Sequence, residues 1–149
     1  MISMKEILMN RAKFEELPEE IQKNLTILHE RINIVRKAYG KPLKVNDGLR
    51  LAHHKPKNGS ATSWHYKGAA IDLDDNDAGD FAKWCIANLE LIANAGLYLE
   101  DFRWTNGCGS WVHFQIYKPR SGKRVFVPST APACNPNIWD GKYDSKLDG

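Results

Sequence analysis

An apolar stripe between residues 21 and 39 constrains the possible folds more than any other feature of the chain. Large apolar side chains recur there at steps of four and three residues, which places them on one face of an α-helix. They are Ile21, Leu25, Leu28, Ile32, Val35 and Tyr39. The segment 17–20 favours a helix start, because proline suits the first turn and acidic side chains complement the helix dipole. Gly40 and Pro42 favour its end, so we predict a core helix without a chemical role.

The rest of the chain alternates strand patterns with one further helical pattern. The strand candidates are residues 43–46, 68–73, 97–104, 111–117 and 123–127. We expect the last two to pair as a hairpin. A helical period runs from about Ala78 to Ala95 and ends at Gly96. Asp74, Asp75 and Asp77, just before it, resemble part of a calcium loop that is not completed, so helix capping is favoured there. This order predicts an α+β fold in which a small antiparallel sheet packs against two main helices.

Length and composition indicate one globular domain. The chain has 149 residues, which suits a single domain with its own core. Hydrophobic residues make up 42% and charged residues 26%, which argues against disorder. We expect the core between about residues 18 and 127. Pro, Ser, Asn and Gly dominate residues 128–149, so we expect an irregular C-terminal tail there.

The net charge limits the classes of binding partner to expect, and the cysteines indicate the redox compartment. The net charge is only +3, and Lys and Arg are spread along the chain, which argues against a nucleic-acid partner. This mild excess favours approach to an anionic polymer such as a bacterial cell wall. Cys85, Cys108 and Cys134 show no paired spacing, which favours a reducing compartment. The chain shows no apolar run of membrane-span length and no apolar signal-peptide core near its start. We therefore expect synthesis in the cytoplasm and no membrane partner.

Two histidines and one aspartate form the strongest candidate for chemistry. His65 precedes Asp72 across a stretch of small residues, and His113 lies in a later strand pattern. On a strand, Asp72 and His113 would point away from their apolar neighbours. Two imidazoles and one carboxylate make a three-ligand zinc site with one position left for water. The alternative is that both histidines only pack in the core.

The residues around this candidate resemble a known family. Ser63-x-His65-x-x-Gly68-x-Ala70-x-Asp72 is similar to the signature of zinc peptidases that cut D-amino-acid bonds in peptidoglycan. That family includes D-alanyl-D-alanine carboxypeptidases and dipeptidases and the L-alanyl-D-glutamate endopeptidases of phage lysis, and the hedgehog signalling domain has a similar site. The segments 45–50, 101–102 and 113–115 resemble three further family elements.

The resemblance implies a role for each site residue. Zn²⁺ would be held by His65, Asp72 and His113. Arg50 would hold a substrate carboxylate or carbonyl, for which its planar fork is suited. Ser63 would form a hydrogen bond near the metal. The implied fold is a small antiparallel sheet that carries the zinc site.

One position departs from the family pattern. The family has an acidic general base three residues before the last histidine ligand, and Ser110 stands there. A serine hydroxyl does not take a proton from water near neutral pH. Glu100 and Asp101 are the nearest acidic residues upstream, and Glu100 is the freer candidate because Asp101 matches a family element of its own. Both can equally be solvated charges at a strand end.

Three functions remain open at this stage. The first is a zinc-dependent peptidase that hydrolyses peptidoglycan stem peptides, either as a D-alanyl-D-alanine carboxypeptidase or as an endolysin-type endopeptidase. A phage-type enzyme of this kind would reach the wall after release or on a virion. The second is a zinc-containing module that binds wall peptide or a protein partner without cutting. The third is a structural protein whose histidines only pack.

Overall fold

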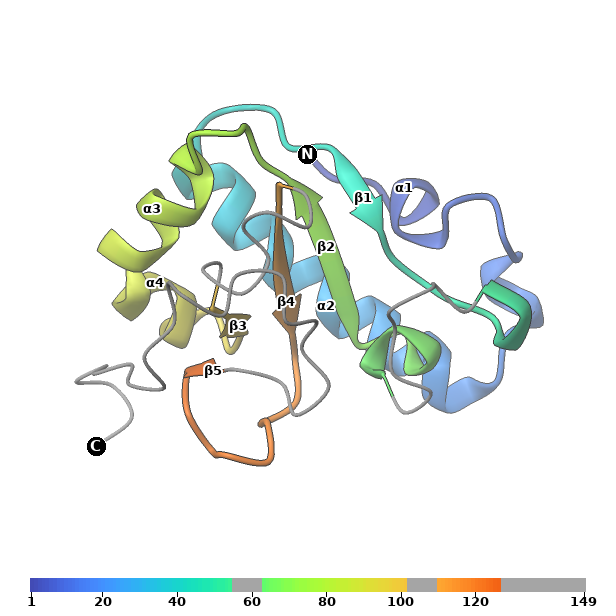
Figure 1. Ribbon diagram of the computed structural model, residues 1–149. Coiled ribbons are helices and arrows are strands. Elements are labelled where there is room, and N and C mark those ends of the chain that lie inside the picture. The colour runs from blue at the N-terminus through green and yellow to red at the C-terminus, as the bar shows by residue number, and fades with distance from the viewer. Residues whose placement is uncertain (55–62, 102–109, 127–149) are drawn as a thin grey trace.

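The structure is built around one five-stranded sheet (Figure 1). It is a computed structural model that describes residues 1–54, 63–101 and 110–126. The strand order is β1-β2-β4-β3-β5, and every neighbouring pair is antiparallel except the parallel pair of β3 and β5. The strands are β1 (Val45–Asp47), β2 (Ala70–Asp74), β3 (Tyr98–Glu100), β4 (Trp111–Gln115) and β5 (Val125–Phe126). The predicted α+β class is confirmed.

Helix α2 (Glu19–Tyr39) confirms the helix predicted from the apolar stripe. It passes behind the sheet in the view of Figure 1. Four of its apolar side chains have no exposed surface: Leu25, Leu28, Ile32 and Val35. Gly40 ends the helix with φ +76°, a left-handed conformation that glycine adopts without steric cost.

The second predicted helix is divided in two by Asn88. The structure has α3 (Asp80–Ala87) and α4 (Leu89–Asn94) in place of one helix over residues 78–95. The Asn88 side-chain amide donates to the Trp84 carbonyl at 2.8 Å, and the Asn88 backbone N–H donates to Cys85. The side chain thus takes the carbonyl that a continuing helix would bond to the backbone N–H. The predicted capping role of Asp75 is confirmed, because its carboxylate accepts two backbone N–H groups of α3.

The last strand pairs differently from the prediction. We expected residues 123–127 to form a hairpin with residues 111–117, but β5 pairs parallel with β3. Strand β4 already has β2 on one side and β3 on the other. A hairpin with β4 would need one of those occupied edges, and β5 pairs instead with the outer edge of β3.

The first residues of the chain belong to the buried core. Helix α1 (Met4–Leu8) begins with a capping box between Ser3 and Glu6, and a short 3₁₀ turn, η1 (Phe14–Glu16), follows. Ile2 and Ile7 are at most 1% exposed. The backbone N–H and carbonyl of Ile2 both bond the Asn33 side chain at 2.8 Å, which ties the N-terminal segment to α2. The predicted tail over residues 128–149, together with Cys108 and Cys134, lies outside the described residues.

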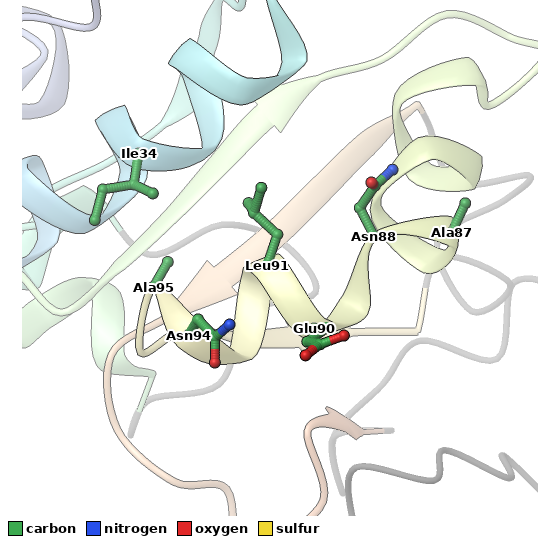
Figure 2. Close-up of a pocket in the computed structure, with 7 residues that line it drawn as sticks. All are labelled: Ile34, Ala87, Asn88, Glu90, Leu91, Asn94 and Ala95. Carbon is green, nitrogen blue, oxygen red and sulfur yellow. The ribbon is translucent and has the colours of Figure 1, made fainter.

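A surface cavity of about 490 Å³ lies between α2 and α4 (Figure 2). Its lining combines apolar side chains with a few polar ones: Ile34, Ala87, Asn88, Glu90, Leu91, Asn94 and Ala95. None of these residues is a predicted site residue. Across the described ranges, no helix combines the length and the apolar character needed to cross a membrane.

We expect Leu28→Ala to lower the free energy of unfolding by about 2–5 kcal/mol, because it opens a cavity where α2 meets the core. Ile34→Ala is the matched control on the same helix. Its side chain is 47% exposed, so we expect a change of about 0.5 kcal/mol or less. Urea denaturation at equilibrium measures both values. Equal effects of the two substitutions would contradict the assignment of the buried face.

Candidate metal centre

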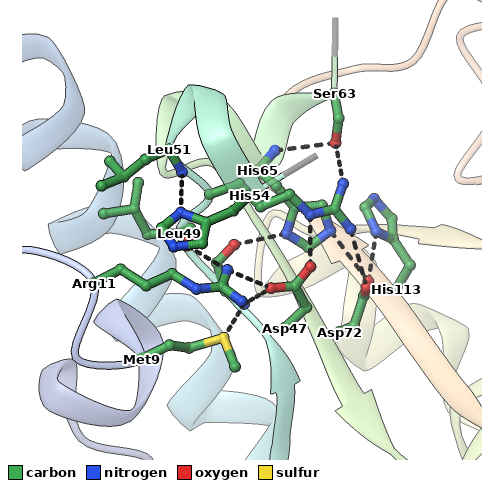
Figure 3. Close-up of polar contacts among 12 residues, drawn as sticks. Met9, Arg11, Asp47, Leu49, Leu51, His54, Ser63, His65, Asp72 and His113 are labelled. Atoms are coloured by element: carbon green, nitrogen blue, oxygen red, sulfur yellow. Dashed lines mark hydrogen bonds and ion pairs between the residues drawn. The ribbon is translucent and has the colours of Figure 1, made fainter. Parts of the chain in front are cut away.

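Three side chains from separate elements meet at one point of the sheet (Figure 3). His65 lies on the 3₁₀ turn η3 (Trp64–Lys67), Asp72 on β2 and His113 on β4. The pairing of β2 with β4 sets Asp72 directly opposite His113. One potential ligand atom from each residue lies within 4.8 Å of the other two. The structure therefore brings together all three residues that the sequence nominated as metal ligands.

The alternation of each strand decides which side chains face this point. On β2, Ile71 and Leu73 are fully buried in the hydrophobic core, and Asp72 between them points to the other face. On β4, Val112 and Phe114 occupy the core in the same way around His113. The apolar neighbours thus fix the orientation of the two polar side chains, as the sequence pattern predicts.

A tight turn places His65 at the start of β2. The Ser63 hydroxyl oxygen caps η3 by accepting the His65 backbone N–H at 3.3 Å. Gly68 ends the turn with φ +67°, and a Cβ there would lie 2.7 Å from Cγ of Leu25. Only glycine satisfies both the positive φ and this close approach to α2. The Ser and Gly positions of the signature therefore serve to hold His65 against the sheet.

Hydrogen bonds behind the rings orient both histidines. His65 Nδ1 lies 2.8 Å from the Gly48 carbonyl oxygen, which can only accept, so Nδ1 carries the proton and Nε2 has the lone pair. His113 Nε2 lies 3.1 Å from Oε1 of Gln115. The Gln115 amide nitrogen donates to the Tyr117 carbonyl at 2.8 Å, which fixes Oε1 toward His113. His113 Nε2 therefore carries a proton, and in the neutral ring Nδ1 has the lone pair.

Both lone pairs face the same carboxylate oxygen. Asp72 Oδ1 lies 3.3 Å from His65 Nε2 and 2.8 Å from His113 Nδ1. Within the described ranges, His65 Nε2 is a buried atom without a hydrogen-bond partner. When both rings are neutral, two nitrogen lone pairs and an anionic oxygen repel one another unless a proton or a metal cation lies between them. This donor set therefore fits a metal ion with nitrogen and oxygen ligands, such as Zn²⁺.

The electrostatics of the group also favour positive charge. Burial alone would raise the pKa of Asp72, but His65 and His113 hold it well below its usual value. Burial lowers the pKa of His113, yet its hydrogen bond to Asp72 and the Asp72 charge outweigh this and raise it to about 9. The carboxylate thus attracts a proton or a metal ion to the position between the rings.

Arg50 and Ser63, the two predicted substrate-binding residues, lie beside the three-residue group. The Arg50 side chain is 10% exposed, and its Nε donates to Oδ2 of Asp47. Its Nη1 lies 3.5 Å from the Ser63 hydroxyl and its Nη2 3.8 Å from Oδ2 of Asp72. Asp47 lies in the segment 45–50, for which the sequence predicted no contact between Asp47 and Arg50. The acidic residue just before a Gly-x-Arg segment was the available signal for its contact with Arg50.

Glu100 stands on the other side of His113. The β3–β4 register pairs Leu99 with Phe114, so the next step sets Glu100 level with His113 and, by alternation, on the same face. Burial, aided by Asp72 and Asp101 and opposed by His113 and Arg50, raises the pKa of Glu100 to about 7.

Two other positions are relevant to the general base, Asp101 and Ser110, and their surroundings differ from those of Glu100. Asp101 is fully buried, and its backbone N–H donates to the Phe126 carbonyl at 2.8 Å. The Ser110 hydroxyl donates to Oδ1 of Asp77 at 3.3 Å, just before β4 begins. The position where an acid was expected therefore carries a hydroxyl that bonds to a neighbouring loop.

Comparison with known proteins identifies the family. The Peptidase M15 family model matches residues 2–105, and the chain belongs to this family of peptidases. The match includes Arg50, Ser63, His65 and Asp72, whereas His113 lies beyond its end and is joined to them by the structure. No curated protein and no solved structure gave a match.

We expect purified protein to bind about one equivalent of zinc, and His65→Ala to abolish this binding, because a carboxylate and one imidazole remain. Gln115→Ala should weaken zinc binding about 10–100-fold by removing the acceptor behind His113. Gln22→Ala is the control, since that amide donates to the Leu17 carbonyl away from the group. Titration with a competing chelator measures the affinities. Zinc bound equally well by His65→Ala would contradict the assignment.

Proposed function

We propose that the protein is a zinc-dependent peptidase that hydrolyses the stem peptides of peptidoglycan. The observation that carries the proposal is the pair of oriented imidazole lone pairs facing Asp72, in a chain that belongs to a peptidase family. The peptidoglycan substrate is supported by the resemblance of the segment 63–72 to peptidases that cut D-amino-acid bonds. The net charge of +3 favours approach to the anionic wall.

The metal would be held by Nε2 of His65, a carboxylate oxygen of Asp72 and Nδ1 of His113. When bound, zinc supplies a Lewis acid that polarises a peptide carbonyl and acidifies water. The Gly48 carbonyl and the Gln115 side-chain oxygen orient the two rings so that Nε2 of His65 and Nδ1 of His113 face the site. The residues around the group then have to bind the substrate and move the proton.

Arg50 would bind the substrate. Its Nε is held by Asp47, whereas the contacts of its two terminal nitrogens to Ser63 and Asp72 are long, at 3.5 and 3.8 Å. Those nitrogens present paired donors that match a carboxylate. A peptide that ends near the scissile bond offers such a group.

Glu100 would accept the proton. Glu100 is level with His113 and on the same face of the sheet, and this position supports a role in moving a proton at the site. Its pKa of about 7 suits a group that takes a proton from the attacking water and returns it to the leaving amine. Asp101 is the second candidate, but it is fully buried.

A second candidate function is a zinc-containing module that binds wall peptide without cutting it. The observation that favours it is Ser110, which stands where the resemblance predicts an acid and bonds to Asp77. In this alternative the metal and Arg50 still bind a peptide carboxylate, and Glu100 only supports the sheet.

Incubation of purified peptidoglycan with the zinc-loaded protein distinguishes the two. We expect new amino and carboxyl termini, detected by mass spectrometry of the released and retained peptides, and their loss when a chelator removes the metal. Re-addition of zinc should restore cleavage. Peptide that binds to the protein but gains no new termini over a long incubation would favour the binding module.

Glu100→Gln should lower kcat about 10²–10⁴-fold with zinc still bound, because the amide cannot accept a proton. In the parent protein we expect activity to rise with pH through an apparent pKa at or below 7, since the base acts in its deprotonated form and a nearby cation lowers the pKa of about 7. This rise of activity with pH should be absent in Glu100→Gln. Glu90→Gln, on exposed α4, is the control. An unchanged profile in Glu100→Gln would transfer the role to another residue such as Asp101.

A further inference from the structure

The carboxylate of Asp47 lies between two guanidinium groups (Figure 3). Its Oδ1 accepts from Nη1 of Arg11 at 2.8 Å, and its Oδ2 accepts from Nε of Arg50. The side chains of Arg11 and Asp47 are 22% and 17% exposed, and that of Arg50 is 10% exposed. The two carboxylate oxygens of Asp47 therefore accept from different arginines, and all three side chains are largely buried.

Arg11 reaches this carboxylate from the far N-terminal segment. The residues before it, Met9 and Asn10, have φ of 55° and 57°, the left-handed region that residues other than glycine adopt rarely. They reverse the chain after α1 and direct Arg11 toward the turn that carries Asp47. Arg11 Nη1 donates to the Leu49 carbonyl as well, at 2.8 Å, so its guanidinium is fixed by two acceptors.

The N-terminal segment and the Asp47 turn are in close contact. The Leu49 backbone N–H donates to the Ile7 carbonyl at 2.9 Å, and the Gly48 N–H donates to Sδ of Met9 at 3.0 Å. A Cβ on Gly48 would lie 2.1 Å from the Ile7 carbonyl oxygen, so no larger residue fits there. The position of Arg11 relative to Asp47 is therefore set by backbone contacts and does not depend on the side chains alone.

This arrangement affects where the Arg50 guanidinium lies. Arg50 stands between two carboxylates, with Asp47 bonded to Nε and Asp72 3.8 Å from Nη2. Without the bond to Asp47, the flexible Arg50 side chain would move onto Asp72, the carboxylate that the metal requires. The bond holds Arg50 by its inner nitrogen and leaves the two terminal nitrogens directed toward the site. Arg11 in turn holds Asp47 in the orientation that makes this bond.

We propose that Arg11 and Asp47 are positioning residues that set the Arg50 guanidinium to bind a substrate carboxylate. The inference rests on the proposed function, since it assigns Arg50 to substrate. It predicts that removing Arg11 impairs recognition of the carboxylate specifically, while the metal site and the fold remain. A merely structural ion pair would alter stability and leave that recognition unchanged.

Binding of two peptides measures the effect directly. The probes are a stem-peptide fragment, diacetyl-L-lysyl-D-alanyl-D-alanine, and the same peptide with a C-terminal amide. All variants carry Glu100→Gln and bound zinc, so that Kd is measured without hydrolysis. In the Glu100→Gln protein, which is the parent for these variants, we expect the free acid to bind at least about tenfold more tightly than the amide. This factor is in the range of a charge-assisted hydrogen bond.

Arg11→Ala should reduce the preference for the acid to about threefold or less, with the affinity for the amide and the zinc content unchanged. Asp47→Asn should have the same effect, because it removes the charge that holds Arg50. Arg11→Lys keeps a cation that can donate to Asp47 and should restore part of the preference. Lys44→Ala is the matched control, since Lys44 forms an exposed ion pair with Asp74 at 3.8 Å and does not contact Arg50.

An acid preference in Arg11→Ala equal to that of the parent would overturn the proposal. If that variant does not fold, Arg11→Lys decides, because it retains the charge but not the double contact to Asp47 and Leu49, and a fully retained preference would likewise overturn it. A parent that binds neither peptide, or binds both equally, also overturns it. Lack of peptidoglycan cleavage by the protein with Glu100 intact contradicts only the peptidase function, because binding is measured separately.

Discussion

The candidate site depends on the register between β2 and β4. This antiparallel pairing sets Asp72 opposite His113, and every other feature of the site is arranged around that pair. A shift of one residue would turn one of the two side chains into the hydrophobic core and bring an apolar side chain to the site. The buried neighbours Ile71 and Phe114 oppose such a shift, because they would lose their places against the helices. The core packing of these strands therefore also fixes the geometry of the polar group.

Charge is balanced around Asp72 by partners on several sides. Two imidazoles face one oxygen, and Arg50 stands near the other without a direct hydrogen bond. If Asp72 were fully paired with Arg50, little of its charge would remain for a cation. Asp47 makes the closer contact with Arg50. Asp47 therefore binds the arginine, whereas Asp72 faces the histidines. This chain thus separates the two anionic groups by strand: Asp47 lies on β1 and Asp72 on β2.

The sequence predicted the parts of the structure that follow local patterns. The apolar period predicted α2, and alternation on two strands predicted which faces Asp72 and His113 occupy. The spacing from Ser63 to Asp72 indicated the family, and Peptidase M15 membership confirms it. These succeed because each depends on residues that are near one another in the chain or on a short signature.

The parts that the sequence did not predict depend on contacts between distant segments. The parallel pairing of β5 with β3 follows from which sheet edges are already occupied, and no local pattern encodes that. The break at Asn88 depends on a side chain competing for a backbone carbonyl inside an otherwise helical period. Arg11 was not recognised because its partner, Asp47, is 36 residues away and the two meet only when the N-terminal segment packs on the turn.

The two halves of the candidate metal centre differ in how early they can form. His65 and Asp72 are joined by one turn and the start of one strand, so they can come close without the rest of the sheet. His113 is 41 residues beyond Asp72 and arrives only when β4 pairs with β2, a non-local step that costs loop-closure entropy. Under the proposed zinc binding, a metal ion would be captured first by the local pair and would then favour the pairing that adds the third ligand. In this order, metal availability during folding would affect the rate at which the sheet is completed as well as the stability of the finished protein.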